Sequence, residues 1–268
     1  MRRTRYSEQF FSDLTETTRT SAEVIVPLVI ELVAPSSVID LGCGVGTWLA
    51  AFARHGVDDY LGVDGDWVPS EALEIPGERF KAARLDHAFN LDRGFDLAVS
   101  LEVAEHLPET AAAQFVGTVV GLAPCVLFSA AIPNQRGQHH VNEQWPEYWA
   151  SLFAERGYAV IDAIRPRVWS APDVAWWYSQ NTLLFARPEV LAARPSLARE
   201  RDRTVESMLS LVHPQALAVV VAERDRNVGR LRAREHSLSD VLSALPSVAA
   251  RSVRWRIGRL RRRARRRS

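Results

Sequence analysis

The chain of 268 residues has little sulfur and no long apolar run. It contains only two cysteines, Cys43 and Cys125, which agrees with a reducing compartment. No apolar run is long enough to span a bilayer, and the basic first residues lack the apolar region of a signal peptide. We therefore expect a cytoplasmic protein in which both cysteines are small buried side chains rather than reactive thiols or ligands.

Acidic residues are absent from the last stretch, 251–268, which contains ten arginines. Because the whole chain has 33 basic and 32 acidic residues, the preceding 250 residues carry 23 basic and 32 acidic side chains. This acidic body argues against nucleic acid as a partner. The Arg-rich tail (residues 251–268) is expected to bind an anionic surface, such as the inner face of a membrane. A soluble basic tail without a partner is the alternative.

Three glycines fall at alternate positions of the stretch V-I-D-L-G-C-G-V-G-T-W-L, residues 38–49. Val38 and Ile39 predict a buried strand that ends at Asp40, and a helix follows the glycines. Glycine is needed where φ is positive or where the backbone presses against a ligand. The free N–H groups of the following helix point at whatever lies on the turn. The stretch predicts the nucleotide-binding corner of an open α/β sheet.

The rest of the chain alternates predicted strands and helices. Strands are expected at Tyr60–Val63, Phe80–Leu85, Phe95–Ser100 and Cys125–Ala130, followed by an antiparallel hairpin at Tyr158–Ile164 and Thr182–Ala186. Helices are expected at 7–33, Thr47–His55, Glu109–Leu122 and Pro146–Gly157. This order predicts an α/β fold with a seven-stranded doubly wound sheet.

The motifs D-L-G-C-G-V-G, G-V-D and F-D-L-A-V-S-L-E-V-A-E-H-L-P together resemble class I S-adenosylmethionine (SAM)-dependent methyltransferases over residues 30–187. The glycine spacing is D-x-G-x-G-x-G rather than the dinucleotide pattern G-x-G-x-x-G. The resemblance implies the Rossmann-like methyltransferase fold, SAM as cofactor, and a helical cap at 7–33 over the cofactor or acceptor site. We therefore expect a methyltransferase domain at 1–187, a helical extension at 188–250 and the Arg-rich tail.

The resemblance also implies which residues bind SAM. Asp64 ends the second strand, about 20 residues past the glycine turn, where a carboxylate can accept hydrogen bonds from both ribose hydroxyls. Asp86 is expected to accept a hydrogen bond from the adenine amino group. The expected cofactor-binding residues are Asp40, Gly42, Gly44, Gly46, Asp64, Gly65, Asp86, Leu101 and Glu102.

A cluster of acidic residues and histidines follows the fourth strand, and the segment H-H-V-N-E-Q-W, residues 139–145, follows the fifth. The pattern E-x-x-E-H followed by H-x-x-E resembles the metal-binding residues of small-RNA 2′-O-methyltransferases. Ubiquinone-pathway O-methyltransferases look similar at E-x-x-E-H. On that resemblance, Mg²⁺ or Mn²⁺ is held by Glu102, Glu105, His106 and His140, although such a site could also take Zn²⁺. Without a metal, His106, His139 or His140 would act alone as general base.

Aromatic residues gather in the segments expected to face the acceptor. Trp145 follows the fifth strand, and Trp176, Trp177 and Tyr178 lie in the insertion before the last strand. Aromatic faces beside polar groups suit sugar or flat ring substrates. The alternative is that these residues bridge the sheet and its helices.

We predict an O-methyltransferase that acts on a hydroxyl of a sugar, a glycan or a small natural product. The choice of substrate class also reflects similarity to bacterial glycan-pathway methyltransferases. One alternative is an N- or C-methyltransferase that acts on a small molecule without metal. Another is a non-catalytic scaffold of the same fold that holds a biosynthetic complex at a membrane, although the intact motifs count against it.

The expected helical extension has few glycines and is rich in Ala, Arg, Leu, Val and Glu. Its apolar residues Val221, Val228, Leu231, Leu238, Leu242 and Leu245 fall near heptad a and d positions. A short coiled coil that forms a homo-oligomer and a helical hairpin packed on the catalytic domain both explain this pattern.

Overall fold

The computed structural model describes the backbone of residues 8–234 and the side chains of residues 16–228. The Arg-rich tail and the heptad positions Leu238, Leu242 and Leu245 lie outside the described residues. The chain divides into two compact units, Met1–Ala216 and Leu217–Ser268. The first unit contains the whole sheet, and it extends past residue 187, where we expect the methyltransferase domain to end.

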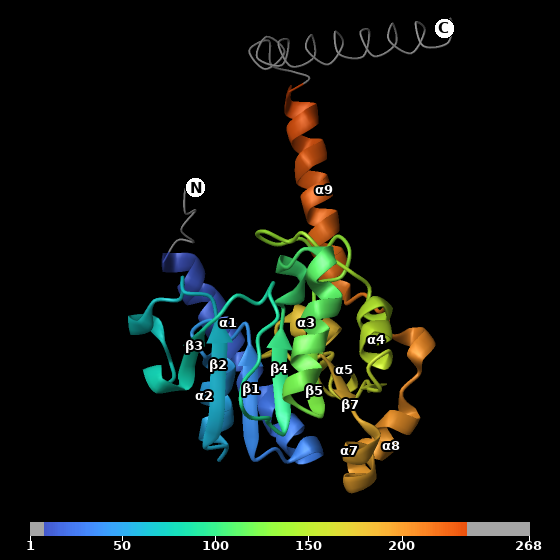
Figure 1. Ribbon diagram of the computed structural model, residues 1–268. Helices are drawn as coiled ribbons and strands as arrows, with labels where there is room; N and C mark the ends of the chain where they lie inside the picture. The colour runs from blue at the N-terminus through green and yellow to red at the C-terminus, as the bar shows by residue number, and fades with distance from the viewer. Residues whose placement is uncertain (1–7, 235–268) are drawn as a thin grey trace, which may run out of the picture. The chain divides into compact units, whose positions relative to one another are not determined.

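A seven-stranded sheet in the order β3-β2-β1-β4-β5-β7-β6 forms the first unit (Figure 1). The strands are β1 (Ser37–Leu41), β2 (Asp59–Asp64), β3 (Phe80–Ala82), β4 (Leu97–Leu101), β5 (Cys125–Ser129), β6 (Ala159–Ile161) and β7 (Leu183–Ala186). Strands β1 to β5 are parallel, and β7 runs antiparallel to both β5 and β6. The predicted doubly wound sheet and its antiparallel end are confirmed. The strand order reverses between β1 and β4, where such sheets bind ligands.

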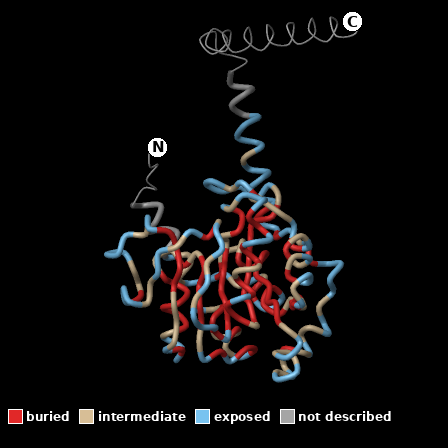
Figure 2. The backbone as a smooth tube through the Cα atoms, in the orientation of Figure 1, coloured by how far each residue is buried: buried red, intermediate tan, exposed pale blue. Residues whose placement is uncertain are grey.

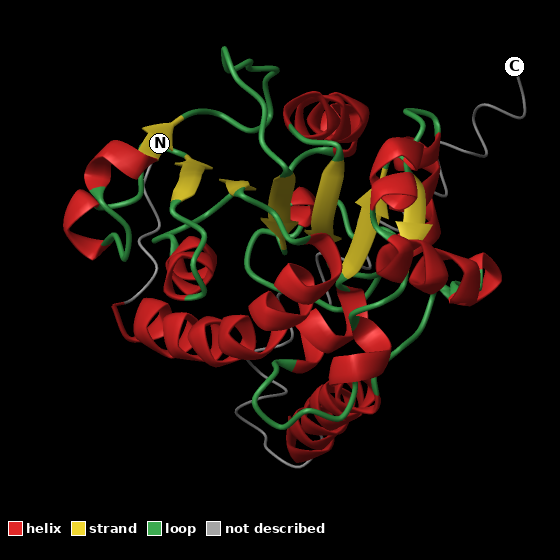
Figure 3. Ribbon diagram, turned by 90° about the horizontal axis from the view of Figure 1, so that it is seen from below, coloured by secondary structure: helices red, strands yellow, loops and turns green. Residues whose placement is uncertain are grey.

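Helices cover both faces of this sheet, which Figure 3 shows as a row of strands between helices. The helices of the first unit are α1 (Glu8–Val33), α2 (Thr47–Arg54), α3 (Glu109–Leu122), α4 (Pro146–Ala154), α5 (Arg165–Val168), α6 (Trp176–Asn181), α7 (Pro188–Ala193) and α8 (Pro195–Arg203). Short 3₁₀ turns lie at Ser70–Ala72, Gly77–Arg79, Ala104–His106 and Glu206–Met208. Helix α1 closely matches the predicted cap at 7–33.

Alternate residues of the central strands face opposite sides of the sheet. Val38 and Leu127 pack in one core cluster with residues of α1 and α2. Their neighbours Ile39 and Phe128 pack in the other with residues of α3 and α4. The strands are therefore buried on both faces (Figure 2). This explains why their sequences read as continuous apolar runs.

Strand β3 is shorter than the predicted strand Phe80–Leu85. It is the edge strand, and its last residue, Ala82, pairs with Asp64, the last residue of β2. Beyond this pair β2 offers no further partner, so the chain leaves the sheet. Asp86 therefore lies in a turn after the strand rather than directly at its end.

The expected helical extension contains three described helices. Helix α8 packs against β6 and α1, and its residue Leu197 is fully buried in the core. Helix α9 (Pro214–Arg234) begins in the first unit and continues in the second, where Val221 and Val228 are exposed. The homo-oligomer stays a prediction. None of the helices in the described range has both the length and the apolar character that crossing a membrane requires.

Candidate active site at the carboxyl edge of the sheet

The turn between β1 and α2 has a backbone that favours glycine. Gly42, Gly44 and Gly46 have φ values of 89°, 53° and 88°. A Cβ atom at Gly42 would lie 2.3 Å from the side chain of Val103, and one at Gly46 would lie 2.8 Å from that of Ile75. A Cβ at Gly44 would meet nothing within 4 Å. Two of the glycines thus allow close packing, and the third borders open space where a cofactor can lie against the backbone.

Asp64 lies beside this turn at the end of β2. Its Oδ2 accepts a hydrogen bond from the amide of Gly44 at 2.7 Å, and its Oδ1 accepts one from the amide of Gly65 at 2.6 Å. Burial raises the pKa of Asp64, and these two hydrogen bonds oppose the rise. Each carboxylate oxygen retains acceptor capacity, so the geometry fits the predicted contact with ribose hydroxyls.

Asp40 is buried close to Asp64. Its Oδ2 has no hydrogen-bond partner within the described structure. Burial, and then the charge of Asp64, raise the pKa of Asp40 well above its usual value. Two acids at the open turn suit a ligand that brings hydroxyl groups and positive charge, as SAM does.

The remaining predicted cofactor residues lie around the same edge. Leu101 ends β4 and Glu102 follows it, while Gly65 lies directly beneath the ring of Trp67. Asp86 accepts two hydrogen bonds from the guanidinium of Arg84, at 3.0 and 2.6 Å. Arg84 and then His87 hold the pKa of Asp86 well below its usual range. Asp86 is thus an ionised carboxylate that is already paired, and its contact with adenine stays a prediction.

Glu105, His106 and His140 form a cluster with metal-ligand chemistry. One ligand atom from each lies within 4.8 Å of the other two, and Nε2 of His140 is 4.0 Å from Oε1 of Glu105. The two imidazole rings are edge to face, with centroids 4.9 Å apart. The backbone carbonyl of Glu105 accepts hydrogen bonds from the amides of Val141 and Asn142 at 2.9 and 3.0 Å. These two bonds tie the loop after β5 to the 3₁₀ turn after β4.

The carboxylate of Glu105 is fully buried, and neither of its oxygens has a hydrogen-bond partner among the described residues. Burial, and then the neighbouring charge of Glu102, raise its pKa well above its usual value. A buried carboxylate without a partner is costly unless a cation or a proton compensates it. A divalent cation between Glu105, His106 and His140 would supply the missing partner, and their oxygen and nitrogen donors suit such an ion.

His106 lies at the solvent-exposed end of this cluster. Partial burial of its ring, and then the neighbouring His140, lower the pKa of His106. The imidazole is therefore neutral at neutral pH, and it can offer a lone pair to a metal or accept a proton. His139, the third predicted base, is exposed and has a left-handed backbone with φ of 64°.

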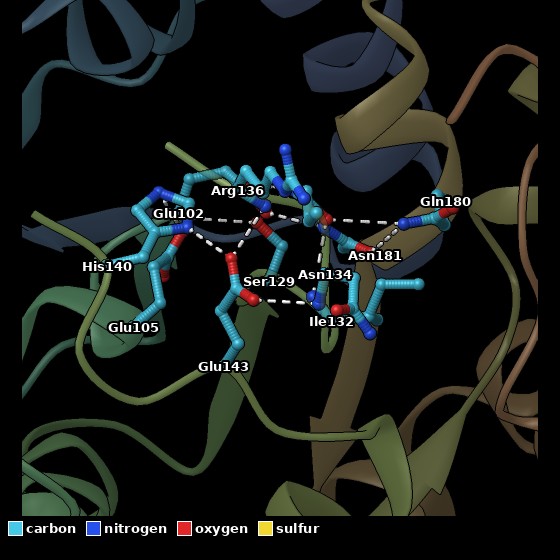
Figure 4. Close-up of polar contacts among 11 residues, drawn as sticks. Glu102, Glu105, Ser129, Ile132, Asn134, Arg136, His140, Glu143, Gln180 and Asn181 are labelled. Atoms are coloured by element: carbon cyan, nitrogen blue, oxygen red, sulfur yellow. Dashed lines mark hydrogen bonds and ion pairs between the residues drawn. The ribbon is translucent and has the colours of Figure 1, made fainter. Parts of the chain in front are cut away.

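Glu102 also has a left-handed backbone, with φ of 55°. Its Oε2 accepts a hydrogen bond from Nε2 of Gln135 at 2.8 Å, and its Oε1 accepts one from Nδ2 of Asn181 at 3.0 Å (Figure 4). Burial raises the pKa of Glu102, and these bonds, led by that from Asn181, oppose the rise. Glu102 lies next to Glu105, but its oxygens contact these two amides instead of joining the three clustered ligand atoms.

Gln135, Gln180 and Asn181 form an amide network that the sequence analysis missed. Oε1 of Gln135 accepts hydrogen bonds from Nδ2 of Asn181 at 2.9 Å and from Nε2 of Gln180 at 3.2 Å. No motif marks these residues. The only available signal was the position of Gln180 and Asn181 directly before β7, which is antiparallel to β5 and so begins at the carboxyl end of β5.

The predicted acceptor-binding aromatics lie in different environments. Tyr178 is buried in the core, with its ring 5.2 Å from that of Trp48 in an edge-to-face contact. Trp177 packs partly buried against the same core cluster. The packing role that we considered for these aromatics therefore describes Tyr178 and Trp177. Trp145 is 41% exposed and Trp176 is partly exposed, so both retain surface that an acceptor can contact.

The chain was compared with protein families and with known proteins. A family model described as a methyltransferase domain matches residues 14–181. The comparison with curated proteins gives no match. Among solved structures, the chain is similar to an O-methyltransferase family protein from Burkholderia thailandensis. That match has a TM-score of 0.50 and 17% identity, and it covers 68% of this chain and 60% of the other.

Two further solved structures are similar. Human N-acetylserotonin methyltransferase in complex with SAM has a TM-score of 0.49 and 14% identity, covering 67% of this chain and 55% of the other. DesVI from Streptomyces venezuelae has a TM-score of 0.48 and 14% identity, covering 68% and 99%. The chain thus spans less than two thirds of the Burkholderia and human proteins. Because the family model covers more than half of its length, the chain belongs to the methyltransferase-domain family.

Proposed function

We propose that this methyltransferase transfers a methyl group to a hydroxyl of a sugar, a glycan or a small natural product, assisted by a divalent cation. Glu105, His106 and His140 would hold the cation, with Mg²⁺ or Mn²⁺ expected. The observation that carries the proposal is the buried Glu105 carboxylate, which lies beside two imidazoles and has no hydrogen-bond partner in the part of the chain that the structure describes. Glu102, the fourth predicted ligand, is adjacent.

SAM, the cation and the residues of the protein would each contribute a different part of the reaction. SAM supplies a methyl group that its positively charged sulfur already activates for in-line displacement. The cation would stabilise negative charge that develops on the acceptor oxygen. Asp64 and the open backbone at Gly44 would hold the cofactor, and the neutral ring of His106 can accept a proton if it is not a ligand. Holding the acceptor oxygen in line with the methyl group is the main task of the protein.

A hydroxyl acceptor needs help from a cation or base, such as the Glu105, His106 and His140 cluster would provide, more than an amine acceptor does. A hydroxyl holds its proton tightly at neutral pH, so its attack requires a cation or a base. A neutral amine attacks without this help. The exposed ring of Trp145 beside the loop that carries His140 supports a sugar or flat ring as the acceptor, because aromatic faces bind such surfaces.

A second mechanism uses a histidine base without metal. The lowered pKa of His106 favours it, because the ring is unprotonated at neutral pH and ready to accept a proton. The two mechanisms make opposite predictions about chelators.

The test is an assay of acceptor methylation after exhaustive EDTA treatment, followed by addition of Mg²⁺ or Mn²⁺. We expect turnover to fall in EDTA and to return with the ion, while SAM affinity measured by calorimetry stays unchanged. Full turnover in EDTA would overturn the cation and leave the histidine base. A protein that binds no SAM at all would instead support the scaffold alternative.

We also propose that the Arg-rich tail, which lies outside the described residues, brings the enzyme to an anionic membrane surface. Its ten arginines without a single acid are the support. Deleting residues 251–268 should leave turnover unchanged and should reduce sedimentation with anionic vesicles. Equal sedimentation of the full and shortened chains would rule out this role.

A further inference from the structure

One carboxylate, that of Glu143, organises the loop that follows β5. Its Oε1 lies 3.0 Å from Nδ1 of His140 and accepts a hydrogen bond from the amide of Arg136 at 2.7 Å. Its Oε2 accepts a hydrogen bond from the amide of Asn134 at 2.8 Å. Figure 4 shows the side chain of Glu143 between His140 and these two backbone groups. Glu143 therefore joins three separate points of one loop.

The backbone of this loop is strained. Asn134, Arg136 and His139 have φ values of 69°, 61° and 64°, a region that residues other than glycine occupy at a cost. Backbone amides that converge in this way form an anion-binding nest. The Glu143 carboxylate provides the anion, so its two amide bonds offset the strain of the loop.

The same loop determines where the ring of His140 lies. A Cβ atom at Gly137 would be 2.1 Å from Nε2 of His140, so the imidazole rests on bare backbone. Both oxygens of Glu143 already accept hydrogen bonds from backbone amides, so the geometry fits Nδ1 of His140 as a further donor to Oε1. The proton is then on Nδ1, and Nε2 keeps its lone pair on the side where Oε1 of Glu105 lies 4.0 Å away.

We propose that Glu143 is a positioning residue that fixes both the ring orientation and the tautomer of His140, so that Nε2 is presented to Glu105 and His106. The consequence for metal affinity rests on the proposed function, whereas the tautomer itself does not depend on it. Carboxylates that hold a ligating histidine in this way increase the basicity of the ring and orient it toward the ion.

The first test reads the tautomer directly. Nitrogen NMR of the imidazoles is recorded on the full chain, metal-free and without SAM, at one alkaline pH, and His140→Ala identifies the His140 signals. We expect the Nδ1–H tautomer in the unmodified protein and its loss in Glu143→Ala. The control, Glu155→Ala, removes an exposed carboxylate at the end of α4 and should leave the spectrum unchanged. An Nε2–H tautomer in the unmodified protein, or an unchanged signal in Glu143→Ala, would overturn the proposal.

The second test measures Mn²⁺ affinity by electron paramagnetic resonance. Glu143→Ala should bind Mn²⁺ roughly 10–100-fold more weakly, the effect typical of losing such a partner, and should keep its SAM affinity. Equal Mn²⁺ affinity in the variant would overturn the positioning role. An unmodified protein that binds no Mn²⁺ but shows the Nδ1–H tautomer would overturn only the cation of the proposed function.

A conservative variant covers the case in which Glu143→Ala does not fold. Glu143→Gln keeps the size of the side chain but places an amide donor against one of the three donors that now face the carboxylate. We expect it to retain a folded circular dichroism spectrum and to show weakened Mn²⁺ binding. Full retention of both the His140 tautomer and Mn²⁺ affinity in this variant would overturn the proposal.

Discussion

The cofactor corner and the acceptor side of this active site lie at one edge of the sheet, but different interactions hold them. At the corner, the amide of Gly42 donates to the carbonyl of Val63 at 2.7 Å, a bond between backbones of adjacent strands. On the acceptor side, Glu102 is held by the side chain of Asn181, 79 residues away in the chain. The corner therefore depends mainly on strand order, and the acceptor side depends on a few side chains.

The two regions also differ in how their carboxylates are compensated. The carboxylate of Asp64 accepts two backbone hydrogen bonds, whereas that of Glu105 accepts none from the described residues. At the corner Asp40 has one buried oxygen without a partner in the described structure, whereas on the acceptor side both oxygens of Glu105 are in that state. The difference indicates that the acceptor side, more than the corner, is completed by what it binds.

The strongest test of this contrast removes the charge of Glu105. Glu105→Gln should lower turnover by more than about 100-fold, because losing a ligand should exceed the 10–100-fold effect of losing a ligand's supporting residue. SAM affinity should stay unchanged, since the corner is intact. Single-turnover assays and calorimetry measure the two quantities, with Glu109→Gln at the exposed start of α3 as control. Normal turnover in the Glu105→Gln enzyme would contradict the proposed difference between the acceptor side and the cofactor corner.

A change at Asp64 tests the corner in the same way. Asp64→Asn places an amide donor against the amide of Gly44 or Gly65, so SAM should bind about 1.5–3 kcal/mol more weakly, the scale of a hydrogen bond to a charged group. Calorimetric titration measures this change. Asp66→Asn, two residues later and exposed, is the control and should bind SAM normally. Equal affinity in both variants would mean that Asp64 does not contact the cofactor.

The dependence on distant side chains is tested at Asn181. Asn181→Ala leaves one oxygen of the half-buried Glu102 without its amide donor, which should lower the free energy of unfolding by about 1–2 kcal/mol. Urea titration of this variant, of Glu102→Gln and of the double variant gives the coupling between the two residues. Strictly additive effects would show that the hydrogen bond contributes nothing to stability.

The smallest expected effect concerns Asp40. Its pKa is raised in the folded protein above the ordinary value of 3.8, so its contribution to stability is complete below that pH and is lost as the pH rises through the raised pKa. Asn has no proton to lose. The SAM-free Asp40→Asn variant should therefore gain stability relative to the unmodified protein between pH 5 and pH 8. Urea titrations at both pH values check this, and a constant difference would contradict it.

The parts of the structure that could be predicted are those encoded by short, contiguous sequence motifs and by the order of neighbouring strands. The glycine turn and Asp64 were identified because strand, turn and acid are contiguous motifs with fixed geometry. Glu105, His106 and His140 could be grouped because β4 and β5 are neighbours whose carboxyl ends meet. The contact between Glu102 and Asn181 could not be predicted, because it depends on a left-handed backbone at Glu102 that no motif marks. The sequence around Tyr178 does not distinguish a side chain that faces a substrate from one that packs in the core.

The antiparallel strand β7 has a consequence for how such enzymes can diversify. Ile161 pairs with Leu184, and Phe128 pairs with Leu183, so β6 ends and β7 begins at the edge where β4 and β5 end. The connecting segment, residues 162–182, therefore starts and finishes at the edge that carries Glu102 and Glu105. Its length and composition can change by insertion without altering strand order or the glycine turn. The segment is nevertheless tied to the rest of the site, because Tyr178 packs against Trp48 of α2 and Asn181 donates to Glu102. An exchange of this segment therefore has to keep those two contacts.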